Sequence, residues 1–251
     1  MTSTHTEERG TRTARALSPS QVTTYTDCAA RWWYGSAMGI EDPPTGALAL
    51  GRSVHTGIAE ALAGHKNADE AFSDAWRVDV GSAELRADED AAQLEAKGLQ
   101  LVKLFMDQAA PGLHVEAIEK KITGPIGTAY TRGVIDIRTT EGEVIDIKTA
   151  SKKPLGISAA HRLQLTTYGM LDHTPKARVI TLTKTKEPAL YDHSFTLTPA
   201  DTHYAVTMFS MVADAIEAGV HLPNRGSTLC SRKQCAFWRE CQADHGGAVR
   251  E

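Results

Sequence analysis

One short stretch, residues 133–149, constrains the fold of this chain more than any other part of the sequence. It contains two runs rich in β-branched residues, 134–138 and 143–148, on either side of a bend that includes glycine. This pattern predicts a β-hairpin. Side chains alternate between the two faces of a strand, so residues two apart share a face. The charged residues that interrupt the two runs are Asp136, Asp146 and Lys148.

The length of the turn decides whether Asp136 and Asp146 lie on the same face. A two-residue turn would pair position 136 with position 147 and would separate the two aspartates. We favour a three-residue loop over 140–142, because Gly142 then occupies the position that needs a left-handed backbone and position 136 pairs with 146. This register sets the two carboxylates side by side, with their Cβ atoms about 4.5–5.5 Å apart.

Two adjacent carboxylates repel each other unless one is protonated or a cation lies between them. A hard divalent ion that prefers oxygen ligands, Mg²⁺ or Mn²⁺, is therefore the expected occupant of this face. The alternative interpretation is an exposed hairpin face that carries ordinary surface charges. The hairpin by itself leaves both interpretations open.

The composition is ordinary for a soluble globular protein, with 41% hydrophobic and 23% charged residues. No stretch is apolar over the eighteen or more residues that a membrane span needs. Residues 1–16 are polar and lack the apolar core of a signal peptide, so we expect a disordered tail and a cytoplasmic protein. The net charge of −4 leaves DNA binding to local basic patches. Candidate contacts are Lys152, Lys153, Arg232 and Lys233.

Capping residues, breakers and hydrophobic periodicity predict an α/β fold with a mixed β-sheet flanked by helices. Ser18, Asn67 and Thr198 are expected to begin helices, the first two with a capping box. The first helix is expected to continue through Cys28 into the aromatic residues 32–34. Further helices are predicted over 47–64, 87–110 and 158–172, and strands over 113–123, the 126–149 hairpin, 176–183 and 190–197. The expected organisation is one domain over 17–246, with a mainly helical part (17–112), a sheet core (113–198) and a C-terminal helix with a cysteine cluster (199–246).

Three of the four cysteines, Cys230, Cys235 and Cys241, lie close together near the end of the sequence, whereas Cys28 lies near its start. Disulfides are not expected in a reducing compartment. Three clustered thiolates and a distant fourth are typical of a metal site, either a Cys₄ iron–sulfur cluster or a Cys₄ zinc site. Two nearby histidines, at positions 221 and 245, keep a mixed zinc site open. Such a site would join the start of the domain to its end.

The sequence as a whole resembles the RecB-like branch of the PD-(D/E)XK nuclease superfamily, in particular stand-alone phage-type and CRISPR-adaptation exonucleases with an iron–sulfur cluster. The resemblance covers residues 18–245 and rests on six motifs in the family's order. Four residues separate Cys230 from Cys235, where two are common in the CRISPR-adaptation nucleases. The motifs are Ser18-Pro-Ser-Gln with Tyr25 and Cys28, Gly51-Arg-Ser-Val-His55, Gly133-Val-Ile-Asp136, Asp146-Ile-Lys148-Thr149, Gln164-Leu-Thr-Thr-Tyr168, and the cysteines 230, 235 and 241.

The resemblance implies a restriction-endonuclease-like core and a metal-dependent exonuclease that hydrolyses DNA from its ends, in recombination, repair or DNA processing. The implied partners are single-stranded DNA or duplex ends, and recombination or adaptation proteins. Lys148 would orient or activate the attacking water, and Gln164 and Tyr168 would position the scissile strand. The implied ligands of Mg²⁺ or Mn²⁺ are His55, Asp136, Asp146 and the backbone carbonyl of Ile147. The implied ligands of a 4Fe–4S cluster, which would staple the N- and C-terminal regions together, are Cys28, Cys230, Cys235 and Cys241.

Two other classes of protein remain open. One is a catalytically silent DNA-binding or assembly module of a recombination or CRISPR-adaptation complex. The complete set of His55, Asp136, Asp146 and Lys148 argues against it, because a decayed site should have lost at least one of them. The other is a zinc-stabilised interaction domain in which the hairpin carboxylates are structural.

Overall fold

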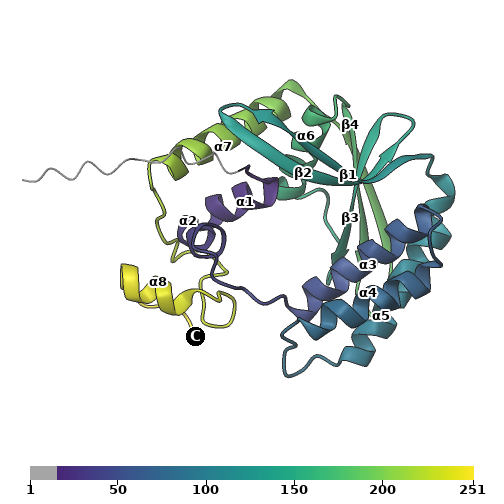
Figure 1. The fold of residues 1–251 in the computed structure, drawn as a ribbon, viewed down its shortest axis with the longest axis horizontal. Coiled ribbons are helices and arrows are strands. Elements are labelled where there is room, and N and C mark those ends of the chain that lie inside the picture. The colour runs from purple at the N-terminus through teal and green to yellow at the C-terminus, as the bar shows by residue number, and fades with distance from the viewer. Residues whose placement is uncertain (1–15) are drawn as a thin grey trace, which may run out of the picture.

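The computed structural model describes residues 16–251. The disordered tail predicted over residues 1–16 therefore lies outside the described residues, except for Ala16. The described part is built around one five-stranded sheet in the order β1-β2-β3-β4-β5, with helices on both of its faces (Figure 1). The strands are β1 (Val115–Ile126), β2 (Ala129–Thr139), β3 (Glu143–Ala150), β4 (Lys176–Thr183) and β5 (Leu190–Thr196).

The sheet is mixed, as the sequence predicts. Strands β1 to β3 form an antiparallel meander, and β4 and β5 form a second antiparallel pair. Only β3 and β4 run parallel, and helix α6 (Ala159–Leu171) connects them. Parallel neighbours need such a crossover because the chain must return to the end of the sheet at which the first strand began, and a tight turn leads only into an antiparallel strand. β3, which carries Asp146 and Lys148, is thereby the central strand of the sheet.

Apolar residues of both faces of the sheet are buried under helices. On one face, Ile145 and Ile147 of β3 pack with Leu50, Phe72 and Phe105 from the three helices α3, α4 and α5. On the other face, Val144 and Val179 pack against Leu165 of α6. Figure 1 shows α3 to α5 on one side of the strands and α6 and α7 on the other. The bounds of these helices are Gly46–Leu62 (α3), Ala68–Gly81 (α4), Ala91–Gln108 (α5) and Pro199–Glu217 (α7).

The caps predicted from the sequence are mostly present. Ser18 and Gln21 form a capping box at the start of α1 (Pro19–Asp27), and Thr198 caps α7. Asn67 caps α4 by accepting a hydrogen bond from Asp69 N, but the reciprocal half of the predicted box is not formed. The helix predicted over 87–110 begins only at Ala91, because the side chain of Asp90 caps it. A short 3₁₀ turn, η2 (Ala110–Gly112), follows α5.

The first helix is not continuous through Cys28, contrary to the sequence-based prediction. Cys28 has an extended backbone (φ −156°, ψ 104°) that ends α1 and caps α2 (Ala29–Trp32), and a π-helical turn η1 (Trp33–Ala37) follows. A helix that the sequence did not suggest, α8 (Trp238–His245), contains Cys241. In Figure 1 α2 and α8 lie side by side, at the far end of the molecule from α3 to α5. No helix within residues 16–251 is long and apolar enough to cross a membrane.

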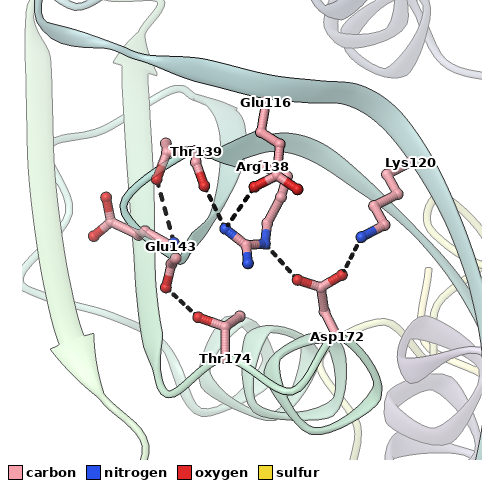
Figure 2. Close-up of polar contacts among 8 residues, drawn as sticks. Glu116, Lys120, Arg138, Thr139, Glu143, Asp172 and Thr174 are labelled. Carbon is pink, nitrogen blue, oxygen red and sulfur yellow. Dashed lines mark hydrogen bonds and ion pairs between the residues drawn. The ribbon is translucent and has the colours of Figure 1, made fainter.

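A buried charge network fixes the C-terminal end of α6 against the antiparallel strands. Asp172, the C-cap residue of α6, accepts from Lys120 of β1 and from Arg138 of β2 (Figure 2). The side chain of Asp172 is only 3% exposed, so the ion pairs replace its lost hydration. Burial pushes the pKa of Asp172 up, but the two cationic donors outweigh it and hold that pKa below its usual range.

Candidate active site

The turn between β2 and β3 has the three-residue form that the sequence predicts. Gly142 has φ +77°, and the ladder pairs Ile137 with Ile145 and Arg138 with Val144. This register is confirmed, and it sets position 136 level with position 146. The ladder ends there, so the two strands separate at the aspartates. β3 stays in the sheet because it continues to pair with β4 through Ala150.

The carboxylate of Asp136 fills the gap where the two strands part. Its Oδ2 accepts a hydrogen bond of 2.7 Å from the backbone N–H of Ile147, in place of a strand partner. The same oxygen lies 3.4 Å from Nδ1 of His55. Burial and the nearby carboxylate of Asp146 raise the pKa of Asp136 to about 7. Asp136 is therefore poised to lose its proton when a cation approaches.

Asp146 lies on the α6 side of the sheet and is 1% exposed. Its Oδ1 accepts from Lys148 Nζ at 2.8 Å and from Gln164 Nε2 at 2.9 Å. Its Oδ2 lies 2.8 Å from the same ammonium, yet the angles at this contact leave it without a hydrogen bond among the described residues. A buried carboxylate oxygen with a free lone pair is unusual, and it suits a metal ligand.

Helix α6 supplies Gln164 and Tyr168 from one face, because they lie four residues apart. Gln164 Nε2 also donates to Tyr168 Oη at 3.2 Å. Tyr168 packs so closely on β2 that a Cβ at Gly133 would lie 2.3 Å from its ring. Glycine at 133 is therefore required by this contact. Burial raises the pKa of Tyr168 to about 12, so this phenol stays neutral and can orient groups but cannot act as a base.

His55 enters the site from α3. Gly51, one turn earlier, lets the helix approach β3, because a Cβ there would already lie 3.3 Å from Oγ1 of Thr149. Burial lowers the pKa of His55, and the neighbouring Lys148 lowers it further. The backbone of Ile147 hydrogen-bonds the imidazole and raises that pKa, which identifies the carbonyl as the acceptor. The predicted ligand atoms of His55 and Ile147 are thus already in contact.

The structure adds Glu119, which none of the sequence motifs indicated. The ladder pairs Ile118 with Ile137 and Lys120 with Ile135, so Glu119 is level with Asp136. Its backbone has φ +49°, a conformation that costs a non-glycine residue about 1–3 kcal/mol. Ligand atoms of His55, Glu119 and Asp136 lie within 4.8 Å of one another. Asp146 is not a member of this close group, because Lys148 and Gln164 hold its carboxylate.

Two open cavities meet at Lys148 and Thr149. One, of about 750 Å³, is lined by His55, Glu119, Asp136 and the basic residues Arg52 and Lys184. The other, of about 500 Å³, lies along the segment that joins β3 to α6 and is lined by Lys152, His161 and His193. His161 lies on α6 one turn before Gln164, a spacing from which its place could have been predicted. Because they share two lining residues, the two cavities form one groove that passes the carboxylates of Glu119 and Asp136.

The four predicted DNA contacts occupy different places. Lys152 lines the groove, and the ammonium of Lys153 lies 5.3 Å from the ring centroid of Tyr191. Arg232 stacks on Trp238 at 4.9 Å and pairs with Glu251 at 2.9 Å. Lys233 is exposed. Only the first of the four therefore lines the groove of the carboxylates.

The four cysteines line a single cavity between the α1–α2 junction and the C-terminal segment. The backbone N–H of Asn224 donates to Cys28 Sγ at 3.4 Å, and Arg225 Nη1 donates to Cys230 Sγ at 3.8 Å. Burial raises the pKa of Cys241, and the three other thiols raise it further. His221 instead stacks on Trp33 at 4.4 Å between ring centroids. Neither His221 nor His245 is among the residues that line the cavity.

Comparisons with known proteins identify a matching family and a solved structure of similar fold. The family model of the PD-(D/E)XK nuclease superfamily matches residues 16–242. A crystal structure described as a "putative exonuclease" from Eubacterium rectale is similar in fold, with a TM-score of 0.61 and 15% identity over 94% of this chain and 90% of that chain. The crystal structure of SSO0001 aligns with a TM-score of 0.39 and 17% identity, over 89% and 94% of the two chains. No curated protein matches the sequence significantly. The match over residues 16–242 shows that the chain belongs to the PD-(D/E)XK nuclease superfamily.

Proposed function

We propose that this protein is a metal-dependent DNA exonuclease whose active site lies where β2 and β3 separate. The observation that carries the proposal is that Asp136 and Lys148 line one groove, while Lys148 also contacts the buried carboxylate of Asp146, whose Oδ2 has no hydrogen-bond partner among the described residues. A divalent ion there would polarise the phosphate and lower the pKa of a bound water. The ligands proposed for it are His55, Asp136, Asp146 and the Ile147 carbonyl.

The donor chemistry supports Mg²⁺ or Mn²⁺. Two carboxylates and one backbone carbonyl are the hard oxygen donors that both ions prefer, and the softer Mn²⁺ accepts the imidazole nitrogen more readily than Mg²⁺ does. The raised pKa of Asp136 reflects burial and repulsion by Asp146, both of which a bound cation would offset. The neutral imidazole of His55, favoured by burial, is the form that ligates metals.

The remaining residues have roles that follow from their positions. Lys148 carries a positive charge into the groove and holds Asp146 until substrate arrives, so it can orient the attacking water and stabilise charge on the phosphate. Gln164 fixes the rotamer of Asp146 and hydrogen-bonds Tyr168. Tyr168 presents a neutral hydroxyl that can donate to a phosphate oxygen of the scissile strand. Arg52, Lys184 and Lys152 line the groove on both sides of this point and would hold the DNA backbone.

We further propose that the four cysteines bind a 4Fe–4S cluster and not a single zinc ion. Four thiolates around one zinc lie about 3.8 Å apart, since each Zn–S bond is about 2.3 Å. Within residues 16–251, no three of the four sulfurs lie within 4.8 Å of one another, a wider arrangement than a single zinc ion would hold. The N–H donors of Asn224 and Arg225 suit the sulfurs of such a cluster.

Linear and covalently closed circular DNA, incubated with Mn²⁺, test whether cleavage starts from ends. We expect the wild type to degrade linear single-stranded or duplex DNA progressively from a labelled end and to leave the closed circle intact. Equal cleavage of both forms would contradict the exonuclease proposal and would assign an endonuclease. Binding without cleavage of either form would favour the silent DNA-binding module.

A further inference from the structure

We propose that Glu119 is a metal ligand of this site and acts together with His55 and Asp136. The inference rests on the proposed metal-dependent function and adds a residue from β1 to the ligands that the two hairpin strands and α3 provide. Ligand atoms of these three side chains lie within 4.8 Å of one another. All three side chains line the same cavity as Lys148.

The surroundings of Glu119 give its carboxylate no other partner. No hydrogen bond or ion pair joins this carboxylate to another residue in the described part of the chain, and the ligand atoms that lie within 4.8 Å of it belong to Asp136 and His55. Glu116, on the same strand, instead faces Arg138 at 3.4 Å (Figure 2). Two glutamates three residues apart therefore have different surroundings, and only Glu119 faces the site.

The backbone indicates that this orientation is imposed on the strand. Glu119 and His173 are the only non-glycine residues with positive φ in the described part of the chain. Asparagine adopts that conformation more readily than glutamate. Glutamate at this position destabilises the metal-free fold in two ways: its backbone has a positive φ, and its carboxylate lies close to that of Asp136. Both costs are understandable if the carboxylate is placed to meet a cation.

Asp146 is absent from the close group because other side chains hold its carboxylate. Lys148 and Gln164 hold Asp146 on the α6 side of the gap between the strands. Glu119 and His55 stand on the opposite side, and Asp136 lies between, where it contacts both His55 and the backbone of Ile147. A cation bound beside Asp136 would therefore meet oxygen ligands from β1 as well as from β3.

The test is Mn²⁺ affinity, measured by calorimetry on metal-free protein, for the wild type, Glu119→Gln and the matched control Glu116→Gln. We expect Glu119→Gln to bind Mn²⁺ roughly tenfold or more weakly, and Glu116→Gln to bind like the wild type. Glu119→Asn is the second variant, since asparagine tolerates positive φ. In the absence of metal, this variant should melt at the same temperature as the wild type or at a higher one. Added Mn²⁺ should raise its melting temperature by less than it raises that of the wild type. A residue with a merely structural role would lower the metal-free melting temperature instead.

Cleavage provides an independent readout. Glu119→Gln should need more Mn²⁺ for half-maximal cleavage and should recover much of its rate at saturating Mn²⁺. Wild-type affinity for Mn²⁺ in both Glu119 variants would overturn the inference, as would a wild type that binds no Mn²⁺. A wild type that never cuts DNA, combined with weakened Mn²⁺ binding in the Glu119 variants alone, would refute the nuclease proposal and leave Glu119 as a ligand.

Discussion

Asp136 and Asp146 lie in the interior of a sheet, and the structure compensates each of them differently. Asp136 accepts the hydrogen bond that the backbone N–H of Ile147 would otherwise donate to a neighbouring strand. Asp146 accepts hydrogen bonds from the ammonium of Lys148 and the side-chain amide of Gln164. The carboxylate of Asp136 is thus left as the less stabilised of the two, with a pKa of about 7. A cation bound between them would offset the repulsion that raises this pKa.

The sequence was sufficient to place these two aspartates and Lys148. Alternation along a strand and a glycine at the left-handed turn position determine which residues share a face, and both are local properties. Glu119 could not be placed in the same way. Its approach depends on a positive φ that no local pattern requires of a glutamate, and on a helix, α3, from another part of the chain.

Gly133→Ala tests the close contact between β2 and α6 by adding one methyl group to it. The added Cβ would lie 2.3 Å from the ring of Tyr168, so either the ring or the strand must move. We expect a loss of roughly 1–3 kcal/mol in the free energy of unfolding and a further loss of cleavage, because Gln164 moves with Tyr168. Gly81→Ala is the control, since its Cβ would meet nothing within 4 Å, and it should be neutral or stabilising. Equal melting temperatures for the two variants would contradict the contact.

At the scale of elements, the type and order of most helices and strands were predictable, but one helix, one helix break and several boundaries were not. Ser18, Asn67 and Thr198 each cap a helix as predicted, because a cap depends on a few adjacent residues. The break at Cys28 was missed, because the extended backbone there is fixed by contacts with residues near 224. α8 was missed for a related reason: it is short, no side chain caps its start, and its place depends on packing of Cys241 against Tyr34 and Phe237.

Asp201→Asn tests how α6 is held in place, and the effect should depend on pH. Arg162 of α6 contacts both carboxylate oxygens of Asp201, at 2.6 and 2.8 Å. This guanidinium holds the pKa of Asp201 well below its usual range. A carboxylate whose pKa is lower in the folded than in the unfolded protein stabilises the fold at pH values above its unfolded-state pKa, which is about 3.9 for aspartate. That stability is lost as the pH falls through the folded-state pKa.

We therefore expect the variant to lose roughly 1.5–3 kcal/mol of unfolding free energy at pH 6–7. The difference from the wild type should shrink below about pH 4. Chemical unfolding at several pH values measures it. A difference that stays constant down to pH 2 would show that the ion pair does not stabilise the junction of α6 with α7.

At the scale of the whole molecule, residues near both ends of the described chain are joined around the cysteine cavity. Asn224 Nδ2 donates to the carbonyl of Asp27 at 2.7 Å, and Ser227 Oγ donates to Asp27 Oδ2 at 2.8 Å. Tyr34 Oη donates to Asp244 at 2.7 Å. The sequence predicted which cysteines gather, because their spacing is unusual, but these hydrogen bonds come from residues without any recognisable motif.

Cys28→Ala and Asp27→Asn separate the proposed cluster from the hydrogen bonds around it. Cys28→Ala should remove the brown colour and the iron of anaerobically purified protein and should lower its melting temperature by several degrees. Asp27→Asn weakens only the bond from Ser227, so it should retain the iron and lose little stability. Wild-type protein with one zinc and no iron per chain would refute the cluster.

The most direct test of the proposed active site compares wild type, Asp146→Ala and Lys148→Ala in single-turnover cleavage of end-labelled DNA with Mn²⁺. Both variants should lose cleavage by several orders of magnitude, since metal and charge stabilisation dominate phosphoryl transfer. DNA affinity should barely change, and only Asp146→Ala should weaken Mn²⁺ binding. Wild-type protein that binds Mn²⁺ and DNA but releases no labelled nucleotide, or variants that cut at the wild-type rate, would contradict the assignment of this site as a nuclease centre.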